Sequence, residues 1–304
     1  MERKNVYICM LAALLSCSDS VKVSRTLDEM PVIFPDYNGV VIPPNIAPLN
    51  FALNDQDAGS CAVFSFGGQQ FEVKGEKGGF VIPPSKWKKL LESAAGNSIQ
   101  VTVQVKQGNE WVAYSPFTIQ VAAEKIDSYL AYRLIDPGYE LWNKMGIYQR
   151  DLESYTQTPI IENKMSGNNC VNCHSFCMQS PDKMLFHMRE TFPGTILVDG
   201  DKIEKLNTKT KETISSLVYP SWHPSGKYVA FSVNTTKQAF HLNDKNRVEV
   251  YDEASDVVVY DVEKHEIVTA STIFSKDAFE TFPTFSPDGK TLYFCTAEAH
   301  PIPQ

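Results

Sequence analysis

Residues 286–294 read Ser-Pro-Asp-Gly-Lys-Thr-Leu-Tyr-Phe, a tight turn that leads into an apolar strand. Residues 223–231 (His-Pro-Ser-Gly-Lys-Tyr-Val-Ala-Phe) repeat the pattern. Residues 180–187 (Ser-Pro-Asp-Lys-Met-Leu-Phe-His) carry a third copy, which we align as one turn residue shorter. Proline fixes φ at such a turn and glycine accepts a positive φ. We therefore expect each copy to join two strands of a repeating unit.

Two of these copies follow aromatic-proline segments in matching register, Tyr219-Pro220-Ser221-Trp222 and Phe282-Pro283-Thr284-Phe285. Together these features resemble the PD40 repeats of TolB-type β-propellers. The resemblance covers residues 175–304 and implies four-stranded blades that bind a partner protein. A propeller needs about four to eight blades, and this segment has room for about three. We therefore expect an incomplete propeller from a longer protein.

The preceding residues have β character of another kind. Residues 98–105 alternate apolar and polar side chains, which predicts a strand with one buried face. Residues 84–95 predict one helix, with Ser85 as its cap and Trp87, Leu90 and Leu91 on one face. We expect a mainly β protein, with an immunoglobulin-like or fibronectin-like β-sandwich over 30–123, a connector over 124–174 and the propeller repeats over 175–304.

The segment Cys170-Val171-Asn172-Cys173-His174 has the C-x-x-C-H pattern of c-type haem attachment. Two thiols at this spacing can each add to one vinyl group of a porphyrin, and His174 then lies beneath the iron as the proximal ligand. Zinc is an alternative, because Cys170, Cys173 and Cys177 with a histidine could hold it. A redox disulfide or inert thiols, without any cofactor, are further alternatives.

The third repeat copy suggests a second iron ligand. Our alignment places His187 where the other copies have Phe231 and Phe294, and a histidine in an apolar strand position often marks a site. We therefore predict His187 as the distal ligand. Three methionines are the alternatives, and two of them alternate onto the face opposite His187. They are Met178, Met184 and Met188.

The N-terminus predicts export. Residues 1–16 combine a basic start with a short apolar run, and Leu14-Leu15-Ser16-Cys17 resembles a bacterial lipobox. We expect cleavage before Cys17, lipid on its thiol, and a polar tether over 17–29 that holds the protein at the outer membrane, in the periplasm or at the cell surface. Bacterial c-type haem is attached outside the cytoplasm, so export and the haem motif agree. The net charge of −8 argues against a nucleic-acid partner.

The whole chain resembles exported Bacteroidetes-type lipoproteins that combine one C-x-x-C-H motif with TolB-like repeats. That resemblance rests on residues 169–177 and on Phe186-His187-Met188-Arg189. It implies the architecture of the chain and no particular activity. Our leading hypothesis is an envelope-anchored haem protein that transfers single electrons or senses a redox state or small ligand with a protein partner. A scaffold without haem and a haem-dependent enzyme are the alternatives. We find no Ser-His-Asp grouping, phosphate loop or carboxylate pair in the sequence, which favours a non-enzymatic role.

Overall fold

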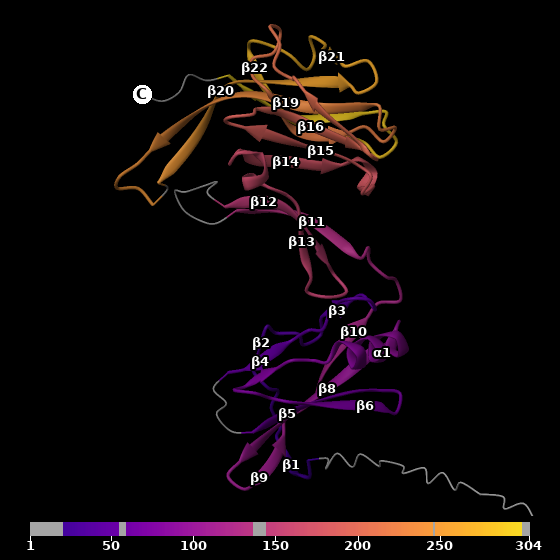
Figure 1. Ribbon diagram of the computed structural model, residues 1–304. Helices are drawn as coiled ribbons and strands as arrows, with labels where there is room; N and C mark the ends of the chain where they lie inside the picture. The colour runs from indigo at the N-terminus through magenta and orange to yellow at the C-terminus, as the bar shows by residue number, and fades with distance from the viewer. Residues whose placement is uncertain (1–20, 55–58, 136–143, 246, 300–304) are drawn as a thin grey trace, which may run out of the picture. The chain divides into compact units, whose positions relative to one another are not determined.

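The computed structural model describes residues 21–54, 59–135, 144–245 and 247–299, and they confirm the mainly β fold class (Figure 1). Two compact units are present. The first runs to Ser128 and also includes Asp151–Thr156, whereas the second contains Tyr129–Arg150 and the chain from Gln157 onward. Each unit has its own hydrophobic core. Among the described residues, no helix is long and apolar enough to span a membrane.

The first unit contains a seven-stranded sheet and a three-stranded sheet. In the larger sheet, β8 pairs along one edge with β5 and along the other with β9 and β10. Its strands are β1 (Val23–Thr26), β3 (Val41–Ile42), β5 (Ser60–Phe66), β6 (Gln69–Lys74), β8 (Ser98–Gln107), β9 (Glu110–Ala113) and β10 (Phe117–Val121). The smaller sheet consists of β2 (Ile33–Phe34), β4 (Phe51–Leu53) and β7 (Gly79–Phe80). The expected tether over 17–29 thus includes β1, which pairs in parallel with β9.

The core of this unit follows the sequence pattern. Every second residue of β8 from Ile99 to Val105 is buried, as the alternation predicts. Helix α1 (Pro84–Ala94) adds Trp87, Leu90 and Leu91 to the same core, which confirms its predicted apolar face. The predicted Ser85 cap is wrong: the helix begins after Pro83, with proline in its first turn and no side-chain cap.

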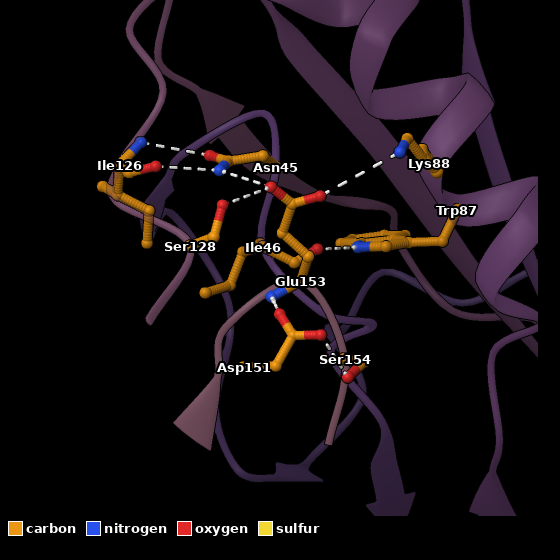
Figure 2. A network of polar contacts seen from close by, with 9 residues as sticks. All are labelled: Asn45, Ile46, Trp87, Lys88, Ile126, Ser128, Asp151, Glu153 and Ser154. Carbon is orange, nitrogen blue, oxygen red and sulfur yellow. Dashed lines mark hydrogen bonds and ion pairs between the residues drawn. The ribbon is translucent and has the colours of Figure 1, made fainter. Parts of the chain in front are cut away.

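A polar network joins two separate stretches of the first unit (Figure 2). Asn45 donates to the Ile126 carbonyl (2.9 Å) and to Glu153 Oε1 (3.2 Å), and it accepts from the Ile126 amide (3.1 Å). Ser128 donates to the same Glu153 oxygen (3.0 Å). The hydrogen bonds from Asn45 and Ser128 lower the pKa of Glu153. The segment 151–156 therefore belongs to the first unit although the chain before and after it does not.

The second unit contains four antiparallel sheets in sequence order, each a simple meander. They have three, four, four and two strands. Their strands are β11 (Tyr129–Ile135), β12 (Met145–Asp151) and β13 (Gln157–Glu162); β14 (Cys170–Phe176), β15 (Lys183–Arg189), β16 (Gly194–Asp199) and β17 (Lys202–Leu206); β18 (Leu217–Trp222), β19 (Tyr228–Phe240), β20 (Val248–Asp261) and β21 (Glu266–Val268); β22 (Ala278–Phe285) and β23 (Leu292–Glu298). Short 3₁₀ turns occupy Asn163–Ser166 and Cys177–Gln179.

The first three of these sheets stack face to face through apolar side chains. One core joins Ile147 of β12 to Val171, Phe186 and Met188 of the next sheet. A second core joins Leu185 and Leu197 of that sheet to the following one, which contributes residues such as Phe231. The expected connector 124–174 is thus mostly a sheet of its own, β11–β13, which packs on the sheet formed by β14–β17. Strands β19 and β20 continue far beyond their sheet as a long hairpin (Figure 1).

A buried carboxylate pair lies where the last two sheets meet, although the sequence suggested no such pair. Asp256 of β20 and Glu280 of β22 are 5% and 4% exposed. The Ser275 amide donates to Asp256, and Ser275 Oγ donates to Glu280 Oε1 (2.9 Å). Burial, and secondarily the charge of Glu280, raises the pKa of Asp256 to about 6.

This carboxyl group should make stability depend on pH. The pKa of Asp256 is higher in the folded than in the unfolded state. Protonation of Asp256 therefore adds to the free energy of unfolding in full below the unfolded pKa of about 3.8, and this contribution is lost as the pH rises through about 6. We expect Asp256→Asn to stabilise the protein at pH 8, by on the order of 1–3 kcal/mol, and to have little effect at pH 4. Denaturant unfolding at both pH values measures this. Asp182→Asn, in an exposed turn, is the control, and equal effects at the two pH values would contradict the prediction.

Candidate functional site

The C-x-x-C-H motif lies on β14, at a bulge that recurs in the stack. In β14, β18 and β22 the ladder places two residues opposite one residue of the following strand. The bulged pairs and their opposing residues are Cys173-His174 with Phe186, Tyr219-Pro220 with Phe231, and Phe282-Pro283 with Phe294. Cys173 and His174 of the C-x-x-C-H motif thus occupy the position at which the other two sheets carry an aromatic residue and proline.

The backbone at this position is left-handed in all three sheets. Cys173, Tyr219 and Phe282 have φ of 50°, 48° and 52°. A residue with a Cβ atom adopts this region at a cost of about 1 kcal/mol or more. Because Tyr219 and Phe282 share this backbone conformation, the strain at Cys173 belongs to the repeat and is no special property of the C-x-x-C-H motif.

The strand register corrects our alignment of the third repeat copy. Asn172 pairs with His187, as Val218 pairs with Ser232 and Thr281 with Cys295. Phe186, and not His187, therefore shares the position of Phe231 and Phe294. The error arose at the turn: ten residue steps separate the paired Ser175 and Leu185, whereas nine separate the corresponding pair Ser221 and Ala230. The extra residue lies beside the 3₁₀ turn at Cys177–Gln179.

His174 is held by a neighbouring sheet. Its ring donates a hydrogen bond to the backbone of Ala131 on β11, and the ring is partly buried. Burial lowers the pKa of His174 more than this hydrogen bond raises it. The imidazole is therefore neutral near pH 7. One ring nitrogen carries the proton shared with Ala131, so the other nitrogen keeps its lone pair for a metal.

The two thiols of the motif form no disulfide in the structure. Cys170 and Cys173 are free cysteines and each is partly exposed. Burial raises the pKa of Cys170, and the charges of Arg189 and Arg133 oppose this rise. Asn172 Nδ2 lies 3.6 Å from Cys170 Sγ. Two available thiols, a neutral imidazole and two guanidinium groups thus gather around β14, and this set fits the attachment of a haem with two carboxylates.

His187 is not brought to the same side as His174. The ring is buried (3% exposed) and lies 3.2 Å from Thr195 Oγ1, on the face shared with Leu185 and the following sheet. Burial lowers its pKa to about 4. His174 instead contacts β11, which lies on the other side. The sheet thus separates the two imidazoles, and the predicted pair of axial ligands does not converge.

The methionine alternatives occupy different places. Met184 and Met188 are buried in the core shared with Ile147, on the side of β12, and so lie on the His174 side of the sheet. Met178 is 59% exposed in the 3₁₀ turn. The lipidation residue Cys17 lies outside the described residues.

The zinc alternative needs Cys177 close to the other two thiols. Cys177 is instead buried in the core between the second and third sheets, beside Lys183 and Asp199. Cys170 lies among Arg133 and Arg189. Within the part of the chain that the structure describes, no three His, Cys, Asp or Glu side chains gather as a metal-binding group.

Comparisons with known proteins assign no family. No family model matches the chain, and no curated protein matches it. Among solved structures, dipeptidyl peptidase 4 of Porphyromonas gingivalis is 14% identical with a TM-score of 0.35, over 57% of this chain and 29% of that one. The GDP-Man-dependent mannosyltransferase MPT-1 of Leishmania mexicana is 13% identical with a TM-score of 0.28, over 66% and 72% of the two chains. These likenesses are too weak to bear on function.

Thiol reactivity tests this arrangement in protein made without haem. At pH 8 we expect iodoacetamide to modify the exposed Cys295 first and the partly exposed Cys170 and Cys173 next. Cys61 and Cys177 should react last, because both are buried and burial raises the pKa of each, to about 11 for Cys61. Peptide mass spectrometry follows each site. Protection of Cys170 and Cys173 that a reductant or chelator removes would show that they are bridged or hold a metal.

Proposed function

We propose that this chain is an exported, membrane-anchored bacterial protein that carries one covalently attached c-type haem on TolB-like propeller repeats. Cys170 and Cys173 attach the haem, and His174 binds its iron. Lipid on Cys17 anchors the chain. The protein transfers single electrons, or senses a redox state or a small ligand, together with a protein partner of the cell envelope.

The observation that carries the proposal is the place of His174, at the bulge of β14 with its partly buried ring against the Ala131 backbone of β11. Histidines that bind metals almost always donate their other ring N–H to a carbonyl or carboxylate, which fixes the tautomer and the ring orientation. A metal ligand must also be deprotonated, and burial keeps His174 neutral. The repeat alone gives no reason for an imidazole here, since the other two sheets place proline at this position.

The surrounding charges support the same proposal. Arg133 and Arg189 both act on the Cys170 thiol, and Arg133 also acts on His174. Guanidinium groups pair well with carboxylates, so these two residues are suited to the haem propionates. When bound, the haem supplies a one-electron couple between ferric and ferrous iron, and the protein partner delivers or accepts that electron.

We assign only His174 to the iron. Because His187 faces the other side of the sheet, the distal position on the iron is taken by a methionine such as Met188 or by an external ligand. Carbon monoxide binding to the reduced protein separates these possibilities, because it requires an open or easily vacated position. Such a position would favour ligand sensing or a haem-dependent enzyme over simple electron transfer.

Haem attachment is the decisive test. Protein produced with the haem-attachment machinery should give a pyridine-haemochrome band and remain coloured after denaturation. The double variant Cys170→Ala, Cys173→Ala should lose covalent haem completely, because no thiol remains to bond the vinyl groups. Cys177→Ala, which changes a buried thiol outside the motif, is the matched control and should keep the band.

Variants of the two histidines then test which imidazole binds the iron. His174→Ala should keep covalent haem but alter its absorption spectrum, whereas His187→Ala should leave the spectrum of the haem unchanged. Absence of covalent haem from the wild-type protein would contradict the proposal and leave the scaffold without haem as the better interpretation.

A further inference from the structure

Two exposed aromatic rings lie at the bulge positions that follow Cys173 in the stack. Tyr219 of β18 and Phe282 of β22 are 45% and 53% exposed. Their ring centroids are 4.8 Å apart at an interplanar angle of 64°, so they touch edge to face. Exposed aromatic residues in contact form an apolar surface that a planar ligand can cover.

Successive sheets of the stack are joined in a similar way. Trp222 Nε1 donates to the carbonyl of Ser175 (3.2 Å). One sheet later, the amide of Phe285 donates to Ser221 Oγ (3.3 Å). Trp222 and Phe285 occupy corresponding positions, and so do Ser175 and Ser221. The placement of β18 beside β14 therefore resembles the placement of β22 beside β18.

This repetition places Cys173 relative to Tyr219. Strand β14 lies beside β18, as β18 lies beside β22. Cys173 precedes Tyr219 in the stack as Tyr219 precedes Phe282, with the same left-handed backbone at all three residues. Because the ring of Tyr219 contacts that of Phe282, this repetition predicts that the Cys173 side chain faces Tyr219 across the adjacent strand.

We propose that Tyr219 and Phe282 form the wall of the haem site, with Tyr219 packed against the porphyrin attached at Cys173. This inference rests on the proposed function and extends it to residues far from the motif in sequence. A porphyrin is a large apolar plane, and its attachment at Cys173 places its edge next to the exposed ring of Tyr219. Packing there removes both apolar surfaces from water.

The test uses haem-loaded protein and the reduction potential of its iron. Tyr219→Ala leaves both attachment thiols in place, so covalent haem should remain. Water then reaches the porphyrin and stabilises the more highly charged ferric form, so the midpoint potential should fall. Tyr219→Phe keeps the ring and should match the wild type. Tyr293→Ala removes an exposed tyrosine (62%) from β23 and is the matched control.

A measurement without haem tests the geometry by itself. In protein made without attachment, Tyr219→Ala should raise the alkylation rate of Cys173 several-fold and leave that of Cys295 unchanged. A covalent haem whose potential is the same in Tyr219→Ala and wild type would overturn this inference alone. A wild-type protein without covalent haem would overturn the proposed function and this inference with it.

Discussion

The register of the first strand in each sheet is the constraint on which the second unit depends. In β14, β18 and β22 a bulge places two residues opposite one, and the ladder resumes with its faces unchanged. Had the strand slipped by one residue, Val171 would have left the core that it shares with Ile147, and every following side chain would have changed face. The bulge lets the motif residues leave the ladder without disturbing the packing between sheets.

The candidate site depends on a sheet that lies outside the recognisable repeats. Strand β11 contributes Ala131, which orients His174, and Arg133, whose charge acts on both His174 and Cys170. Strand β12 of the same sheet places Ile147 against the same face of the β14–β17 sheet. The segment before the motif is thus part of the site, because it fixes the imidazole and supplies positive charge.

Polar groups buried between the sheets are matched in two different ways. His187 forms a hydrogen bond with Thr195, and Ser232 forms one with Thr281 at 3.1 Å, so these neutral groups satisfy one another. Asp256 and Glu280 instead share Ser275 as a donor, and one oxygen of Glu280 has no hydrogen-bond partner among the described residues. Burying two acids together costs free energy that a bound proton reduces, which makes this junction sensitive to pH.

Local patterns in the sequence determined much of the architecture. The alternation of residues 98–105 predicted β8, the apolar spacing of Trp87, Leu90 and Leu91 predicted one face of α1, and the turn motifs predicted the hairpins of the repeats. These features depend on neighbouring residues, so the sequence contains the information needed to predict them. The haem hypothesis is equally local, because it depends only on the spacing of two thiols and an imidazole within five consecutive residues.

Only the tertiary structure decided which side chains share a face. One extra residue beside Cys177 moved His187 out of the phenylalanine position and turned it away from His174, and no local pattern reveals such a shift. The contacts of His174 with Ala131 and of Tyr219 with Phe282 join residues 43 and 63 positions apart. The carboxylates of Asp256 and Glu280 meet across two sheets. Such contacts depend on how separate sheets stack, which is a property of the folded chain and not of any one segment.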